Sequence, residues 1–142
     1  MENLEGYDRN SMALGMIEAF CEMVWQEVKP LALSPIMEPD QWAAIGEAVD
    51  TVAGRYSVRY FVEKPLMSSD LAPDESLEGK TVVLFYKYDE VLNSYIALKN
   101  ESERLKSEKS FDGDARKKLS VSFRRLLGYP ENVIAEHYSR RG

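Results

Sequence analysis

A chain of 142 residues with 44% hydrophobic and 30% charged side chains is long enough to bury a core and too apolar to be disordered throughout. Its net charge of −6 disfavours non-specific binding to nucleic acid, and its single cysteine, Cys21, excludes an internal disulfide. No apolar run approaches the ~20 residues that span a bilayer, so we expect one domain over residues 1–142 in a cytoplasmic protein without a membrane association.

The first predicted element is a helix over about residues 11–27, with Asp8, Asn10 or Ser11 as its cap. Its apolar arc is wide and holds two stripes of side chains. The first stripe consists of Met12, Ala13, Met16, Phe20, Met23 and Val24, and the second of Leu14, Cys21 and Trp25, with Ile17 between them. The methionines could form an adaptable binding stripe, but with Phe20 and Val24 beside them we interpret them as core. We interpret Cys21 as a packing residue, and we expect Leu14 and Trp25 to contact another molecule.

Three further elements follow in the middle of the chain. Residues 29–35 contain two prolines, which predict an extended linker or a short edge strand. A second helix is expected over about residues 40–53, with small and β-branched side chains suited to packing on a sheet. Residues 57–63 alternate in polarity and predict a strand with one drier face, whereas residues 81–88 are apolar on both faces and predict a central strand.

Residues 64–80, between these two strands, form a long acidic loop. It contains two prolines and the acids Asp70, Asp74, Glu75 and Glu78. Loops of this length are usually functional or mobile. The spacing of the acids does not match a calcium-binding loop, so we interpret them as solvated charges rather than as metal ligands.

The last third of the chain is predicted to be helical. One helix starts near Asp89, which suits an N-cap, and residues 99–111 form its polar end or a linker. A second helix lies between the cap Asp112 and the stop Gly128, and a short third helix begins at Pro130.

The order of elements indicates an α+β fold. We expect a small α/β sandwich in which helices pack on a two- to three-stranded sheet and the C-terminal third is all helical. The alternative is a mostly helical bundle that carries one β-hairpin.

Charge is divided along the chain. Residues 1–103 carry 19 acidic and 8 basic side chains, a net of −11, whereas residues 104–142 carry 5 acidic and 10 basic, a net of +5. The division predicts that the basic end either folds against the acidic body or binds an acidic partner.

The basic side chains gather on the helix that follows Asp112. Helical spacing places a stripe of four cations opposite its apolar face, namely Lys117, Lys118, Arg124 and Arg125. Such a stripe could hold a phosphate, a nucleic-acid backbone or an acidic protein surface, although a solvated outer face explains it as well.

Aromatic side chains concentrate on the two predicted strands. Tyr60 and Tyr86 could line a pocket there, with Arg59 and Lys87 as cations for an anionic ligand; an ordinary aromatic core is the alternative. The one histidine, His137, cannot supply a set of histidine ligands, and no recognisable catalytic or phosphate-binding motif is present. We therefore predict no catalytic residues, no metal site and no cofactor.

The sequence favours a non-catalytic accessory or regulatory module over an enzyme, acting through protein–protein contacts as a homodimer or with an acidic protein. The alternative is a small-molecule binding protein, or an enzyme without a recognisable motif, with its pocket near the strand aromatics. A nucleic-acid role through the basic helix alone is a weaker third hypothesis. Burial of Tyr60 and Tyr86 under helices favours the first hypothesis, and their exposure around a cavity favours the second.

Overall fold

The computed structural model describes residues 7–141, which form an α+β fold of helices around a small antiparallel sheet. The elements in chain order are α1 (Arg9–Trp25), β1 (Leu31–Leu33), α2 (Pro39–Arg55), β2 (Arg59–Glu63), α3 (Asp74–Leu77), β3 (Val82–Tyr86), α4 (Asp89–Ser107), α5 (Gly113–Leu126) and α6 (Glu131–Arg141). Three strands rather than a single hairpin join in the sheet, which confirms the predicted α+β class over the helical bundle.

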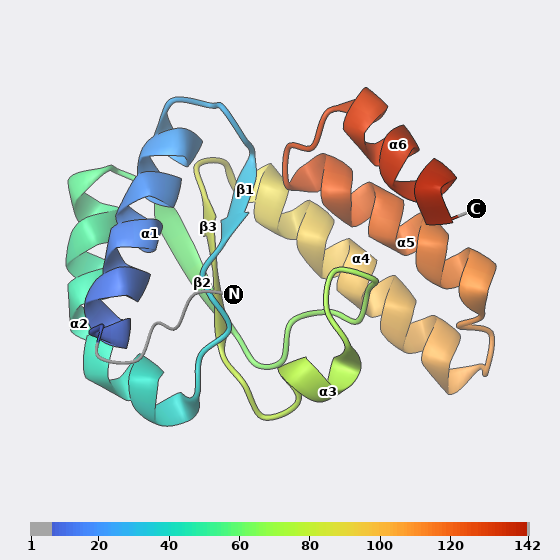
Figure 1. The fold of residues 1–142 in the computed structure, drawn as a ribbon, viewed down its shortest axis with the longest axis horizontal. Helices are drawn as coiled ribbons and strands as arrows, with labels where there is room; N and C mark the ends of the chain where they lie inside the picture. The colour runs from blue at the N-terminus through green and yellow to red at the C-terminus, as the bar shows by residue number, and fades with distance from the viewer. Residues whose placement is uncertain (1–6, 142) are drawn as a thin grey trace.

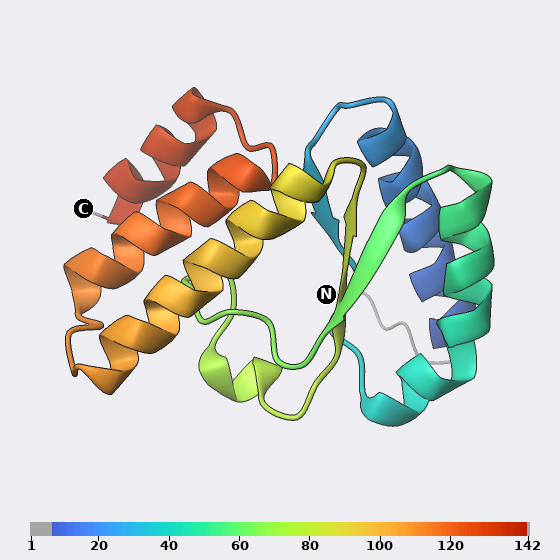
Figure 2. The ribbon, with the colours of Figure 1, turned by 180° about the vertical axis from the view of Figure 1, so that it is seen from behind.

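The sheet lies between two layers of helices (Figure 1). The layer of α1 and α2 covers one face, and α4 and α5 cover the other, with α6 outside α5 (Figure 2). β3 is central in the order β1-β3-β2 and runs antiparallel to both neighbours. All five residues of β3 are buried because a helical layer covers each face, which confirms the predicted central strand.

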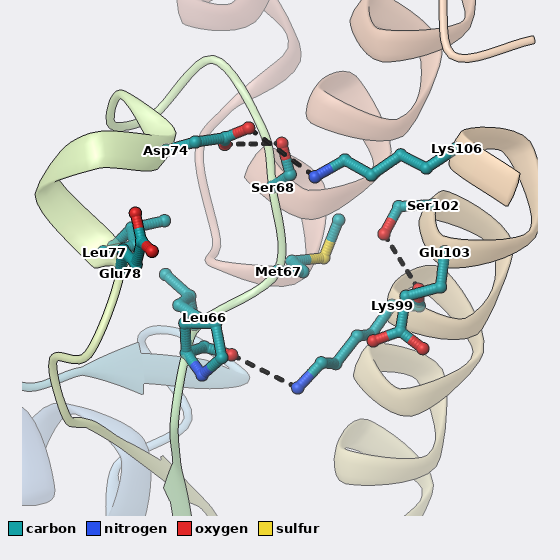
Figure 3. Close-up of a pocket in the computed structure, with 11 residues that line it drawn as sticks. Leu66, Met67, Ser68, Asp74, Leu77, Glu78, Lys99, Ser102, Glu103 and Lys106 are labelled. Atoms are coloured by element: carbon teal, nitrogen blue, oxygen red, sulfur yellow. Dashed lines mark hydrogen bonds and ion pairs between the residues drawn. The ribbon is translucent and has the colours of Figure 1, made fainter. Parts of the chain in front are cut away.

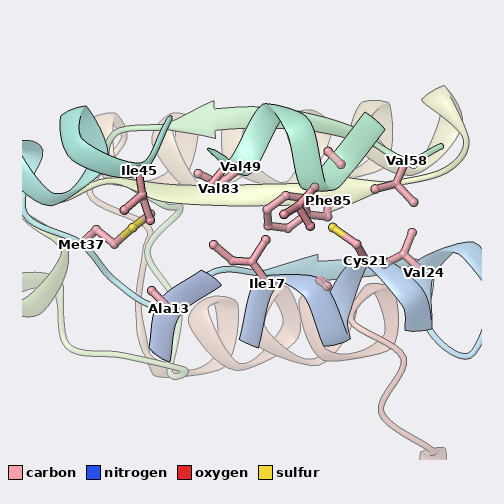
Figure 4. Close-up of a cluster of buried hydrophobic side chains, with 13 residues drawn as sticks. Ala13, Ile17, Cys21, Val24, Met37, Ile45, Val49, Val58, Val83 and Phe85 are labelled. Atoms are coloured by element: carbon pink, nitrogen blue, oxygen red, sulfur yellow. The ribbon is translucent and has the colours of Figure 1, made fainter. Parts of the chain in front are cut away.

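The first core lies between the sheet and the layer of α1 and α2 (Figure 4). Its members from α1 and β3 are Ala13, Ile17, Cys21, Val24, Val83 and Phe85. α1 therefore turns the seam between its two apolar stripes toward the sheet. Small and β-branched side chains on that seam allow a close approach of helix to sheet. The prediction that Met12, Met16 and Met23 are core residues is wrong, because all three are exposed.

The second core lies on the opposite face of the sheet, under α4 and α5. Tyr95 of α4 and Phe123 of α5 are fully buried there, with ring centroids 5.7 Å apart. Residues 64–80, called the 64–80 segment below, add Leu66 and Met67 to this core and include α3. Part of the predicted solvated loop is therefore packed over the sheet, because its apolar side chains have a core to enter.

Two of the predicted helix caps are confirmed. Asp8 and Asp112 cap α1 and α5 by accepting backbone hydrogen bonds through their side chains. Asp89 is not a cap, because it lies in the first turn of α4 and makes no capping bond. Gly128 follows α5 with φ +90°, and a Cβ there would come 2.8 Å from the Cβ of Lys29, so the close approach of these two turns requires glycine.

Candidate functional site

The strand residues that were predicted to form an anion-binding pocket point in different directions. Tyr86 faces the second core and is buried, whereas Tyr60 faces the first core and donates from its hydroxyl to Asp50 at 2.8 Å. Arg59 is exposed and pairs with Asp89 at 2.5 Å. The two tyrosines diverge because β2 and β3 pair in a register that sends them to opposite faces of the sheet.

Lys87, the remaining member of that predicted pocket, belongs to a surface cluster at the end of α1. Its Nζ lies 4.2 Å from the ring centroid of Trp25 and donates to Glu27 Oε2 at 2.9 Å. The bond to Glu27 raises the pKa of Lys87 and lowers the pKa of Glu27 itself. Lys87 therefore stays charged over the Trp25 indole, which remains partly exposed.

The predicted basic face of α5 is divided by the packing of α6. Lys117, Lys118 and Arg125 are exposed, and Arg125 binds Glu131 at the start of α6. Arg124 is buried, so its predicted place on a solvated outer face is wrong. Spacing along α5 alone could not reveal this, because α6 covers one edge of the stripe.

Arg124 joins a cluster of Asp70, Arg124, His137 and Tyr138, called the Asp70 cluster below. Asp70 Oδ1 accepts a hydrogen bond from Arg124 Nη2 at 2.9 Å, and Oδ2 accepts one from the Tyr138 hydroxyl at 2.6 Å. Arg124 Nη2 also lies 3.3 Å from His137 Nε2. Burial acts to raise the pKa of Asp70, but the hydrogen bonds from Tyr138 and Arg124 hold that pKa below its ordinary value. The cluster ties the 64–80 segment to α5 and α6.

Among residues 7–141, two ion pairs between residues far apart in the sequence join the acidic body of the chain to its basic end. One is Asp70 with Arg124, and the other is Asp74 of α3 with Lys106 of α4 at 3.5 Å. The hydrogen bond from Ser68 lowers the pKa of Asp74, and Lys106 adds to that effect. These pairs confirm that the basic end folds in part against the acidic body.

A cleft of about 260 Å³ lies between the 64–80 segment and one face of α4 (Figure 3). We call it the α3–α4 cleft. Its apolar lining consists of Pro65, Leu66, Met67 and Leu77, and its polar lining of Ser68, Asp74, Glu78, Lys99, Ser102, Glu103 and Lys106. The α4 residues recur every three or four positions and therefore share one face of that helix. Lys99 and Lys106 reach across the two ends of the cleft, to the carbonyl of Pro65 and to Asp74.

A buried polar network lies beside the cleft. Glu63 Oε2 forms an ion pair with Lys99 Nζ and accepts a hydrogen bond from the Tyr95 hydroxyl, both at 2.7 Å. The Tyr95 hydroxyl in turn accepts from the backbone N–H of Met67 at 2.9 Å. Burial, together with the bond to Glu63, raises the pKa of Tyr95 far above its ordinary value. The sequence offers one pointer to this network, since Tyr95 and Lys99 lie four residues apart on a helix.

The second candidate surface is on α1, where Met12, Met16, Ala19 and Met23 form an exposed strip that we call the methionine face. The three methionines are 41%, 46% and 39% exposed. Leu14, which was predicted to contact another molecule, is half-buried against the first core. The exposed methionines therefore come from the stripe predicted as core, whereas Ala13 and Val24 of the same stripe are buried, and Trp25 of the second stripe is also partly exposed. Cys21 is buried as predicted, and burial, with the Glu18 carboxylate nearby, raises its pKa to about 12.

The chain matches no protein-family profile, no curated protein and no solved structure. Within residues 7–141, no group of three or more histidine, cysteine, aspartate or glutamate side chains is arranged to hold a metal ion. None of the helices described is both long and apolar enough to cross a membrane. The α3–α4 cleft and the methionine face are the two candidate functional surfaces of the described residues.

Proposed function

We propose that this protein is an accessory interaction module that forms a homodimer through the methionine face of α1. The observation that carries the proposal is the exposure of three methionines on one side of one helix. Flexible, polarisable thioether side chains suit adaptable protein contacts. Contiguous apolar surface of this kind is commonly covered by a partner.

The order of residues on the methionine face suits a second copy of the same chain. Its spacing of four, three and four residues reads the same in both directions. In an antiparallel two-fold pair, Met12 of one copy lies opposite Met23 of the other, and Met16 lies opposite Ala19. A large side chain then meets a small one at the centre, as packing of ridges into grooves requires.

The burial of the strand tyrosines also supports this proposal over the ligand-binding alternative. Tyr86 is buried in the second core, and Tyr60 is half-buried with its hydroxyl bound to Asp50. The two tyrosines therefore do not line a common pocket, and their positions give no support to an anionic ligand at Arg59 and Lys87.

Sedimentation equilibrium across the micromolar range tests the proposal. We expect the wild type to dimerise and Met16→Glu to weaken the dimer by at least about tenfold, because the new carboxylate is desolvated at the centre of the interface. Val133→Glu is the matched control, since Val133 on α6 is 45% exposed and lies outside the proposed interface. A wild type that stays monomeric throughout, or an equal effect of both variants, would refute the methionine face as a dimer interface.

A further inference from the structure

We infer that the α3–α4 cleft is a binding site for a primary alkylammonium group carried on a short aliphatic chain. This inference is independent of the proposed dimer, because α4 lies on the opposite side of the sheet from α1. It rests on the size of the cleft, on the charges that line it and on the direction in which its hydroxyl groups donate.

The size and apolar lining of the cleft define the aliphatic part of the ligand. A volume of about 260 Å³ is below the ~300–1,000 Å³ of pockets that hold drug-sized ligands. Leu66, Met67 and Leu77 are buried members of the second core, and each also presents surface to the cleft. Apolar walls of this extent favour a chain of a few methylene groups over a fully polar ligand.

The charges that line the cleft favour a cation. Lys99 is already bound to Glu63 at 2.7 Å, and Lys106 is paired with Asp74. Glu78 and Glu103 also line the cleft, and neither has an ion-pair partner among residues 7–141. Two lysines and three acids therefore give the lining a net charge of −1, which is favourable for an ammonium and unfavourable for a carboxylate or phosphate.

The serine hydroxyls in the lining point to the same ligand. Ser102 donates its proton to the carbonyl oxygen of Lys99 at 2.8 Å, and Ser68 donates to Asp74 Oδ1 at 2.7 Å. Both hydroxyl protons are thus committed within the protein, so each oxygen has only acceptor capacity left for a ligand. An ammonium group is the matching partner, because it has three donors and no acceptor.

Titration of the isotope-labelled protein followed by amide NMR tests this site, with n-butylammonium as the probe and n-butyrate as a chain of matched length and opposite charge. We expect saturable shifts at residues 66–68 and 99–106 with n-butylammonium and none with n-butyrate. The double variant Glu78→Gln with Glu103→Gln should bind n-butylammonium at least about tenfold more weakly, because it removes two charge-assisted hydrogen bonds.

Glu75→Gln is the matched control, because Glu75 is an exposed acid of α3 that does not line the cleft. It should leave binding unchanged. Absence of saturable shifts, equal binding of n-butyrate, or unchanged binding by the double variant would each overturn the inference.

A second arm separates the two sources of such a group. 1,4-Diaminobutane represents a free amine, and lysine blocked at both ends represents a lysine side chain of a peptide. Tighter binding of the diamine would identify a free amine as the ligand class, and tighter binding of blocked lysine would identify a peptide. Failure of both to bind would overturn the inference.

Discussion

Glu63 and Arg124 are charged side chains that are buried, and each is balanced by a residue far away in the sequence. Glu63 binds Lys99 of α4, and Arg124 of α5 binds Asp70 of the 64–80 segment. A buried charge is costly when its partner is missing, because water no longer solvates it. These pairs therefore penalise arrangements in which α4 or the 64–80 segment sits elsewhere on the sheet.

Replacing Glu63 by glutamine should test this penalty. Glu63→Gln preserves an acceptor for the Tyr95 hydroxyl but leaves the ammonium of Lys99, whose side chain is only 20% exposed, without its counter-charge. We expect a loss of about 3 kcal/mol in the free energy of unfolding, measured by urea denaturation. Adding Lys99→Met should restore most of that loss, because it removes the unpaired charge. Additive losses in the double variant would show that the two side chains are not coupled.

The sequence could not predict Glu63 as a buried residue. Alternation along residues 57–63 correctly predicts a strand, but it puts Glu63 on the same face as the exposed Arg59. Glu63 can be buried only because α4 packs over this face of the sheet and supplies Lys99 as a counter-charge. The same limit applies to α1, where two stripes are equally apolar and only the packed sheet selects the seam between them.

The 64–80 segment and α6 depend on one another, because both bind through Asp70. The carboxylate of Asp70 accepts from Arg124 and from Tyr138 of α6, and its backbone N–H donates to Ser120 Oγ at 2.9 Å. One side chain thus fixes an irregular segment to two helices. Loss of its charge should loosen both attachments at once.

Acidification should reveal this dependence. The folded state holds the pKa of Asp70 below its ordinary value, which is about 3.9 in an unfolded chain. The stability that Asp70 contributes is therefore fully present above about pH 5 and is lost as the pH falls through about 4 toward the folded pKa. We expect Asp70→Asn to be less stable than the wild type at pH 6, and the difference to shrink below pH 4.

Hydrogen exchange at pH 6 and below pH 4 separates a local from a global effect of Asp70→Asn. At pH 6, Asp70→Asn should raise amide exchange in the 64–80 segment and in α6 while leaving β3 protected. Asp114→Asn is a suitable control, because Asp114 is an exposed acid of α5 outside the Asp70 cluster. A constant difference in stability across the pH range would contradict a role for the Asp70 charge.

Helix positions were predictable to within a few residues where caps and apolar periodicity coincide, as for α1 and α5. The structure of the polar residues 99–111 was harder to predict, and a helix end and a linker both remained open, because this stretch has few apolar side chains. α4 nevertheless continues to Ser107, where Leu105 packs against the second core and Lys99 and Lys106 bind the 64–80 segment. A helix face that packs through one apolar side chain and several polar contacts gives little periodic hydrophobicity to detect.

At the scale of the whole molecule, the two cores share β3 as a common wall. Val83 and Phe85 face the core under α1 and α2, whereas Val82, Leu84 and Tyr86 face the core under α4 and α5. Damage to one core should therefore be transmitted to the other through a single strand. This geometry supports the expectation of one domain, which remains a prediction until the two halves are shown to unfold together.

Leu84→Ala offers a direct measurement of that coupling. Leu84 is fully buried in the second core, so its truncation should lower the free energy of unfolding by about 3 kcal/mol. Both tryptophans, Trp25 and Trp42, belong to the opposite layer, and their fluorescence reports chiefly on α1 and α2. Far-UV circular dichroism reports on all of the helices. If the molecule is one cooperative unit, both probes should show the same fall in the urea midpoint.

Val83→Ala supplies the mirror-image control, since Val83 neighbours Leu84 on β3 but faces the first core. It should shift both probes together as well, by a smaller amount because fewer methyl groups are removed. Protein concentration must be held constant, since dimerisation would itself stabilise the folded state. A fluorescence midpoint that Leu84→Ala leaves unchanged, while the circular dichroism midpoint falls, would mean that the layer of α1 and α2 unfolds independently. In that case β3 would be a boundary between two units rather than the centre of one.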